Sequence, residues 1–141
     1  MVRVIHDDVE MFLAGYLRGV LGPREEPYAQ DVQVGNSEPV PGEPFPERLI
    51  VVRDDGSTRT EMVTDVVSVG VSVLAGTKED GRDASNLARL VRALIEDCPS
   101  PDPANPIAAV RESNGPYRVP EDQPRARCYM TFVMSRVGRA L

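Results

Sequence analysis

The chain has 141 residues, of which 41% are hydrophobic and 27% charged, which is the composition of one globular domain spanning residues 1–141. Its formal net charge of −6 argues against nucleic-acid binding, which requires clustered Lys and Arg side chains. No apolar run reaches the roughly 20 residues of a membrane helix, and the acidic start of the chain does not resemble a secretory signal, so we expect a cytoplasmic protein without membrane contact.

An amphipathic helix is expected at the start of the chain. Asp7 or Asp8 can cap it, Glu10 lies in its first turn, and Gly22-Pro23 ends it. A single apolar stripe follows the helical repeat at Val9, Phe12, Leu13, Tyr16, Leu17, Val20 and Leu21. A short strand over residues 31–34 comes next.

Residues 35–46 differ from the rest of the chain because they contain four prolines, which exclude a regular helix or a central strand. The segment is too early in the chain to link two domains, since only one helix and one short strand precede it. Long loops inside a domain are usually functional, so we interpret it as an extended arm that reaches a neighbouring subunit, with a simple surface excursion as the alternative.

Two strands of a hairpin are expected next, at 49–53 and 58–64, with a turn at Asp54-Asp55-Gly56-Ser57. The strand over 65–74 has the clearest alternation in the sequence. Val67, Val69, Val71 and Val73 alternate there with Ser68, Gly70 and Ser72, so one face is bulky and the other has a row of small residues. Such a row of small residues lets a helix or another subunit approach closely, and helix packing is the commoner cause.

A second amphipathic helix is expected to begin at Asp83 or Ser85 and to end near Cys98-Pro99. A second proline-rich connection leads to short strands at 107–112 and 116–119, on either side of Asn114-Gly115. The last strand, over 127–137, alternates well. Because runs of strands are not interleaved with helices one by one, we predict an α+β fold, with a largely antiparallel or mixed sheet and both helices packed on one face.

The residues that carry chemistry do not form a convincing active site. His6 is the sole histidine, and Cys98 and Cys128 have a spacing typical of neither zinc nor redox motifs, so both cysteines are interpreted as packing residues. The adjacent acidic pairs at 7–8 and 54–55 have local roles as cap and turn, and the segment after Gly76 lacks the second glycine of a phosphate loop. We therefore expect no enzyme, no metal and no cofactor.

Three parts of the sequence together resemble the tail terminator proteins of long-tailed bacteriophages, especially those of high-GC hosts. They are the opening helix from Asp8-Val9-Glu10 to Tyr16-Leu17-Arg18, the strand at 65–73 leading into the helix at 84–94, and the C-terminal module that begins at Gly115-Pro116-Tyr117. That module continues through Pro124-Arg125, Tyr129 and Thr131 into a valine-rich strand. The resemblance covers nearly the whole chain in element order, whereas the length of the proline-rich segment departs from the family.

The resemblance implies a small α+β subunit of a hexameric ring that caps the end of the tail tube, stops its polymerisation and joins the tail to the filled head. Its partners would be other copies of the chain, the tail tube protein and the head-closure or connector protein, with genomic DNA passing through without specific binding. The location would be the virion, with assembly in the host cytoplasm.

Two sets of residues are expected to act in such a ring. Residues 1–70 carry 6 basic and 13 acidic side chains, whereas residues 71–141 carry 10 basic and 9 acidic ones. An acidic surface and a nearly neutral surface could be complementary in an assembly. The alternative is that the acidic side chains serve solubility alone. The predicted subunit interface comprises Pro39, Pro41, Pro44, Phe45, Arg118, Arg125 and Arg127. A predicted acidic lumen, which would repel passing DNA, comprises Glu25, Glu26, Asp54, Asp55, Glu79 and Asp80.

Two alternatives stay open at this point. One is a head-closure or head–tail joining protein of the same particle, which would bind the portal side rather than the tube. The other is a small ligand-binding regulatory α+β domain, which requires a pocket with converging polar groups.

Overall fold

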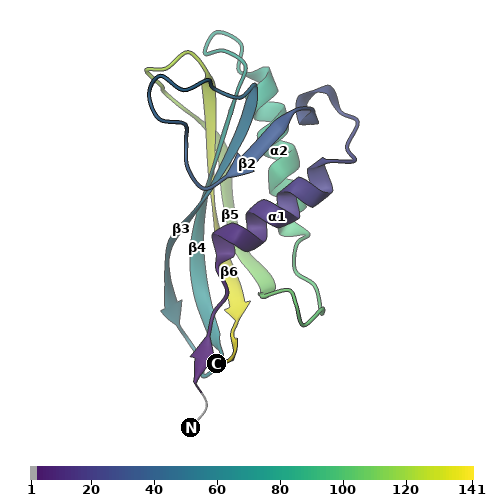
Figure 1. Ribbon diagram of the computed structural model, residues 1–141, viewed down its shortest axis with the longest axis vertical. Helices are drawn as coiled ribbons and strands as arrows, with labels where there is room; N and C mark the ends of the chain where they lie inside the picture. The colour runs from purple at the N-terminus through teal and green to yellow at the C-terminus, as the bar shows by residue number, and fades with distance from the viewer. Residues whose placement is uncertain (1–2) are drawn as a thin grey trace.

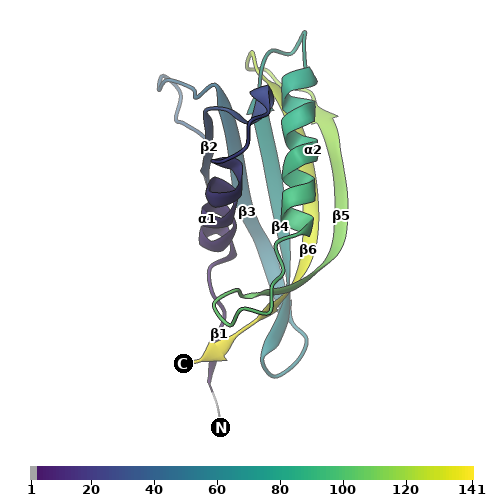
Figure 2. The same cartoon turned by 90° about the vertical axis from the view of Figure 1, so that its right-hand side faces the viewer.

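A five-stranded sheet covered on one face by two helices forms the molecule in the computed structural model, which describes residues 3–141 (Figures 1 and 2). The elements in chain order are β1 (Val4–Ile5), α1 (Val9–Leu21), the 3-10 helix η1 (Pro27–Ala29), β2 (Val32–Gly35), β3 (Arg48–Arg59), β4 (Thr64–Ala75), α2 (Arg82–Glu96), β5 (Ile107–Val119), β6 (Ala126–Val137) and β7 (Arg139–Ala140).

The sheet has the strand order β2-β3-β4-β6-β5, in which β2 and β3 are parallel and the other neighbours are antiparallel. The predicted α+β class with a mixed sheet and helices on one face is therefore confirmed. Strands β1 and β7 form a separate two-stranded antiparallel sheet beside both ends of the chain, at the bottom of Figure 1. We call this end of the molecule the lower end, and the opposite end, at the top of Figure 1, the upper end.

The two helices form for the reasons that their sequences indicate. In α1 the Asp8 carboxylate accepts hydrogen bonds from the backbone N–H groups of Glu10 (2.9 Å) and Met11 (3.1 Å), which caps the helix as expected. In α2 the N-cap is Gly81, so the helix begins before either expected residue. Asp83 lies in its first turn instead, where it pairs with Arg48 of β3 at 3.0 Å and so joins the helix to the sheet.

The hydrophobic core lies between the helices and the valine face of β4. Val67, Val69, Val71 and Val73 are fully buried there, and their partners on β6 are Met134, Phe132, Met130 and Cys128 in the same order. Both helices turn their apolar stripes toward this face.

The opposite face of the sheet, here the outer face, carries the small residues of β4. The expectation that a helix packs against them is wrong, because both helices cover the bulkier valine face, where they bury more apolar surface. The space above Gly70 is filled by Tyr129, whose hydroxyl lies 2.3 Å from the position that a Cβ atom at Gly70 would take. Arg53 donates a hydrogen bond of 3.0 Å to the same hydroxyl and crosses this face.

Both turns predicted inside long strands are wrong. Strand β3 continues through residues 54–57 with a bulge, in which Gly56 has φ = 111° and its N–H donates to the Asp54 carboxylate at 2.8 Å. The chain reverses at residues 60–63 instead, so residues 58 and 59 belong to β3 and not to a returning strand. Strand β5 likewise continues through Asn114-Gly115 with a shift in register. Both segments have the residues of a tight turn, but pairing with the neighbouring strand continues on both sides of them.

An ion pair between Asp65 and Arg136 is buried where the sheet leaves the helices, near the lower end. The two residues are opposite each other on β4 and β6, and only 4% and 6% of their surfaces are exposed. The guanidinium donates to both carboxylate oxygens, at 3.0 and 2.7 Å, and to the backbone carbonyl of Asp7 at 2.9 Å. The pair therefore joins the central strands to the segment that leads into α1.

Candidate interaction surface

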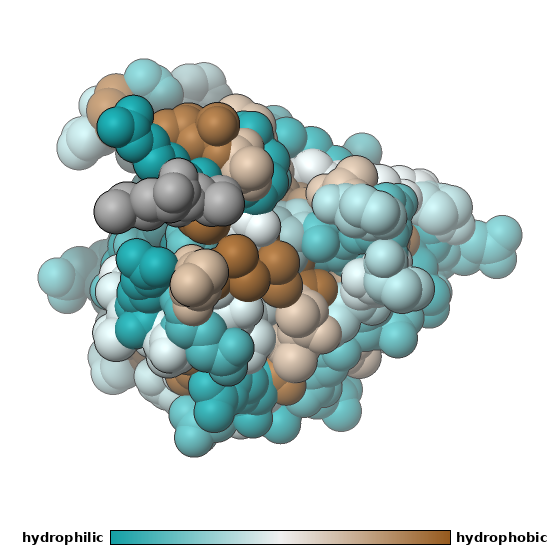
Figure 3. All heavy atoms as spheres, turned by 90° about the horizontal axis from the view of Figure 1, so that it is seen from below, coloured by the Kyte–Doolittle hydropathy of each residue, from teal (hydrophilic) through white to brown (hydrophobic). Residues whose placement is uncertain are grey.

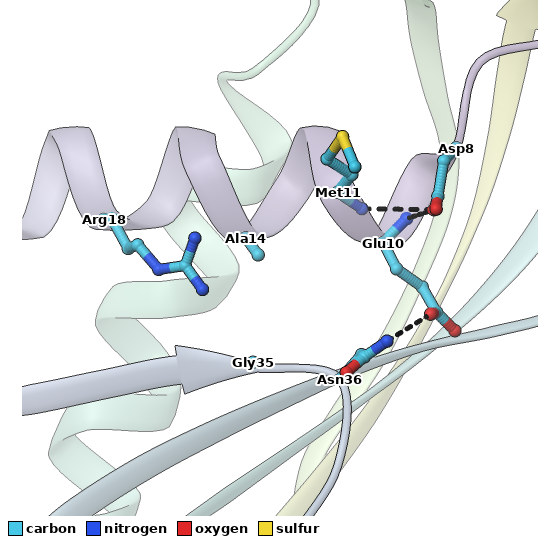
Figure 4. Close-up of a pocket in the computed structure, with 7 residues that line it drawn as sticks. All are labelled: Asp8, Glu10, Met11, Ala14, Arg18, Gly35 and Asn36. Carbon is cyan, nitrogen blue, oxygen red and sulfur yellow. Dashed lines mark hydrogen bonds between the residues drawn. The ribbon is translucent and has the colours of Figure 1, made fainter.

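The hollow beside the start of α1, shown in Figure 4, has a volume of about 220 Å³. Its polar groups already have structural partners. Glu10 reaches from α1 to accept hydrogen bonds from Asn36 (3.1 Å) and from the backbone N–H of Asp54 (2.7 Å), and Arg18 donates to the carbonyl of Val34 at 2.6 Å. These side chains join α1 to β2 and β3 rather than converging on a ligand.

The histidine and the cysteines occupy structural positions. Cys98 and Cys128 are buried and unpaired with each other, and burial, with a smaller contribution from the charge of Asp97, raises the pKa of the Cys98 thiol to about 12. His6 precedes α1, with its Nε2 atom 3.2 Å from the carbonyl oxygen of Val63 and 3.8 Å from the Asp65 carboxylate. Within residues 3–141 no group of three or more His, Cys, Asp or Glu side chains is arranged to hold a metal ion.

The proline-rich arm, which we define as residues 36–47, folds back onto its own chain at the upper end. Arg127 of β6 donates to the Glu38 carboxylate at 2.6 Å and also to the Glu121 carboxylate. Arg125 donates to the backbone carbonyls of Glu47 and Phe45, and its guanidinium lies 5.0 Å from the centre of the Phe45 ring. Two arginines about 80 residues further along the chain thus hold the arm.

The arm lies across the outer face of the sheet. Leu49 and Leu74 are opposite each other on β3 and β4, on the face away from the helices, yet they are only 4% and 0% exposed. Leu49 lines a hollow together with arm residues that include Pro39 and Pro46, and the next strand carries Arg127, opposite Leu74. Because the arm contacts both neighbours of Leu74, it provides the cover that buries these two leucines.

The electrostatics of this contact favour a fixed arm. The side chains of Arg127 and Glu121 are both 17% exposed, so their mutual attraction is only partly screened by water. Burial by itself would lower the pKa of Arg127, but its hydrogen bonds with Glu121 and Glu38 outweigh that effect and raise the pKa above its ordinary value. The guanidinium therefore stays charged and keeps both carboxylates in place.

Six of the seven predicted interface residues lie in this arm or hold it to the sheet, and their role at a subunit interface stays a prediction. They are Pro39, Pro41, Pro44, Phe45, Arg125 and Arg127. The seventh, Arg118, lies on the helix side of the sheet, where its guanidinium fills the space beside Gly81 at the start of α2 and donates to the carbonyl of Lys78 at 3.3 Å. The outward side of the arm remains open to solvent, and Val40 is 59% exposed.

The six residues of the predicted acidic lumen lie on three separate segments of the chain. Glu25 and Glu26 follow α1, Asp54 and Asp55 form the bulge of β3, and Glu79 and Asp80 precede α2. One acid of each pair has an arginine partner two residues away, at 2.9 Å for Glu26, 2.6 Å for Asp55 and 3.0 Å for Asp80. The hydrogen bonds from these arginines lower the pKa of Glu26 and of Asp80. No contact within the chain brings the three pairs together in residues 3–141.

A second surface, which the sequence did not indicate, lies at the lower end. Five of the exposed large apolar side chains gather there, in what we call the lower-end patch: Ile5, Met62, Val63, Val137 and Leu141. Figure 3, which views this end, shows apolar side chains near the middle of the face with polar ones around them. Three segments far apart in the sequence supply the patch, so no local pattern could have revealed it.

Neither helix within residues 3–141 combines the length and the apolar character that crossing a lipid bilayer requires. A comparison with protein-family models found no family that matches the chain, and a comparison with curated proteins found no relative.

Proposed function

We propose that the protein is a tail terminator of a long-tailed bacteriophage: a structural subunit that forms a ring at the end of the tail tube. The ring would stop polymerisation of the tube and provide the surface that joins the tail to the head. The proposal rests on the sequence resemblance described above, and the α+β class of the fold is compatible with it. It places the protein in the virion, without enzymatic activity and without a cofactor.

The structural observation that supports assembly with other copies is the proline-rich arm, although its length departs from the family that the sequence resembles. Prolines restrict its backbone, Arg125 and Arg127 fix it on the sheet, and it still exposes Val40 and neighbouring prolines to solvent. A segment that is ordered before binding loses little conformational entropy when it contacts a second protein, so its exposed apolar side chains can contribute to association. A preorganised contact of this kind suits a subunit that assembles with other copies.

A closed ring arises when one surface of a subunit contacts a different surface of the next copy and the rotation between them closes. Where the ring places acidic side chains such as Glu25 and Glu79 around its channel, they would repel the phosphates of passing DNA and let it slide. Reversing the charge of these acids should then slow DNA ejection, and unchanged ejection would contradict the acidic-lumen hypothesis.

The test is direct. Purified protein is examined by light scattering and negative-stain imaging, alone and with tubes of the tail tube protein of the same phage. We expect rings of six copies, about 92 kDa for a chain of 15.4 kDa, that cap one end of each tube and stop its growth. Tubes that elongate unchanged in its presence would contradict the proposal, and binding to the portal side alone would favour a head-closure protein instead.

A further inference from the structure

The lower-end patch is held in shape by backbone contacts between its three segments. Strands β1 and β7 pair with Val4 opposite Ala140, and the N–H of Gly138 donates to the carbonyl of Val63 at 2.7 Å. The N–H of Leu141 donates to the carbonyl of Arg3 at 2.8 Å. The apolar side chains are therefore presented by a fixed backbone rather than by independent loops.

Two arginines, Arg3 and Arg59, lie beside this patch, and Glu61 is the exposed carboxylate at the tip of the β3–β4 hairpin. Arg59 donates to the carbonyls of Glu61 and Met62, both at 3.0 Å, so its guanidinium is fixed beside the tip of the β3–β4 hairpin. Arg3, Arg59 and Met62 line a hollow of about 590 Å³, and the one carboxylate in its wall, Asp65, is neutralised by Arg136. Within residues 3–141 neither Arg3 nor Arg59 has a carboxylate partner within 4.0 Å.

The proline-rich arm at the upper end has the opposite charge and a matching apolar surface. It contains three glutamates and neither Lys nor Arg, and its outward side exposes Val40, Pro41 and Pro44. Glu43 has no ion-pair partner within residues 3–141. The adjoining loops at 76–81 and 120–125 are also acidic. Of the seven carboxylates on the three loops, four pair with arginines, and three have no ion-pair partner within residues 3–141: Glu43, Glu79 and Asp122.

We propose that the proline-rich arm of one copy docks on the lower-end patch of a second copy. An apolar segment flanked by carboxylates then meets an apolar patch flanked by unpaired arginines, which is complementary in both hydrophobicity and charge. The net charge of −6 makes anionic membranes and nucleic acids poorer occupants of the patch, because the molecule as a whole is repelled by them.

The two surfaces lie at opposite ends of the molecule, so the contact joins different surfaces of two copies and leaves one of each free. It therefore propagates to further copies, into a closed ring or an open chain depending on the angle between neighbours. The closure into a ring rests on the proposed function, whereas association of the arm with the patch does not.

Two single substitutions test the contact from its two sides. Val40→Glu places a charge on the arm, and Met62→Glu places one in the patch. Val40 is 59% exposed and Met62 is 71% exposed, so neither side chain contributes much to folding. Met11→Glu is the matched control, because Met11 is 75% exposed on α1, outside both surfaces. Self-association is measured by sedimentation and light scattering up to about 1 mM protein, the range in which weak specific contacts are populated.

We expect the wild type and the Met11→Glu variant to associate equally. The Val40→Glu and Met62→Glu variants should each associate about 30- to 100-fold more weakly, which is the effect of losing a central interface contact. Mixing the Val40→Glu and Met62→Glu variants should yield a 1:1 dimer, since each supplies the surface that the other lacks. Added salt should weaken association of the wild type, because the arginines and carboxylates are screened.

Three results would overturn the inference: a wild type that stays monomeric at about 1 mM, variants that associate like the wild type, or a mixture that forms no dimer. Each leaves the proposed function to be decided by the tube-capping experiment. A ring that assembles normally from both variants and still caps tubes would show that another surface joins the subunits.

Discussion

The buried ion pair between Asp65 and Arg136 allows a quantitative test of the structure. The substitution Asp65→Asn keeps the size of the side chain and one hydrogen-bond acceptor, but it leaves the Arg136 guanidinium, 6% exposed, without a countercharge. Removing one member of a buried ion pair lowers the free energy of unfolding by about 3–5 kcal/mol. We expect a loss near the low end, about 3 kcal/mol, because Asn keeps one acceptor and Arg136 keeps its hydrogen bond to the carbonyl of Asp7. Urea denaturation followed by circular dichroism measures this loss as a lower midpoint at unchanged slope.

The same pair predicts how stability depends on pH. Burial would raise the pKa of Asp65, but the hydrogen bonds and charge of Arg136, together with the charge of His6, outweigh burial and hold the pKa below its ordinary value. A carboxylate whose pKa is lowered by folding stabilises the protein above its unfolded pKa of about 3.9, and that contribution is lost as the pH falls through the folded pKa. The difference in unfolding free energy between the wild type and Asp65→Asn should therefore be complete at pH 7 and shrink below about pH 4.

The double substitution Asp65→Leu with Arg136→Met is the matched control. Removing both charges leaves no unpaired ion, so the double variant should lie within about 1 kcal/mol of the wild type if the new side chains pack well. A loss of less than about 1 kcal/mol for Asp65→Asn at pH 7, or a difference that does not shrink in acid, would refute the assignment of this pair as a buried, mutually dependent ion pair.

Three further predictions concern the outer face, the arm and a buried thiol. Arg127→Met should speed amide hydrogen exchange within the proline-rich arm by about 5-fold, because it removes the partly exposed ion pair with Glu38, worth about 1 kcal/mol. Unchanged exchange would show that other contacts hold the arm. Gly70→Ala should destabilise the protein by about 1–2 kcal/mol, since its Cβ would lie 2.3 Å from the Tyr129 hydroxyl. Tyr129→Phe removes that hydroxyl, so thermal unfolding of the double variant should show a smaller penalty. With a pKa raised to about 12, Cys98 should react with Ellman's reagent at pH 8 at least about 100-fold more slowly in the native protein than in urea, and equal rates would contradict its burial.

The elements that could be predicted from the sequence are those with a long apolar period. Helix α1, the stripe of α2 and the alternation of β4 and β6 each repeat over a dozen residues, so one misplaced residue does not obscure the pattern. The fold class follows from their order alone. The start of α2 could not be predicted, because Gly81 caps the helix without a side-chain hydrogen bond and Asp83 pairs with Arg48 of β3 instead of capping it.

Two errors have the same cause. Asp54-Asp55-Gly56 and Asn114-Gly115 both have the chemistry of a tight turn, and both lie in bulges of continuous strands. A short segment determines that the backbone can adopt positive φ, as Gly56 and Gly115 do, but whether the chain then reverses depends on pairing with a strand elsewhere. That information is nonlocal and is not contained in a single window of sequence.

The contacts at the candidate surfaces are also nonlocal and could not be predicted from short stretches of sequence. The arm was recognisable from its prolines, and Arg125 and Arg127 from their charge, but the contact between them joins residues about 80 apart in the chain. The sequence indicated the participants without indicating that they bind one another. An arm held by its own chain differs from a free arm, because most of the entropy cost of ordering it is met during folding rather than during association.

The opposite character of the two ends follows from how the strands are connected. Strands β3, β4 and β6 run nearly the full length of the sheet, so every connection lies at one end or the other. The upper-end connections at 36–47, 76–81 and 120–125 carry most of the loop carboxylates. Toward the lower end, a long proline-rich connection at 97–106 leads from α2 into β5 on the helix side, whereas the connections at 60–63 and Gly138 are short. Short connections cannot fold back over the sheet, so the apolar ends of the strands stay exposed at the lower end. The same chain that covers its own leucines at one end thus leaves an apolar patch at the other, and the inference that a second copy covers it depends on this asymmetry.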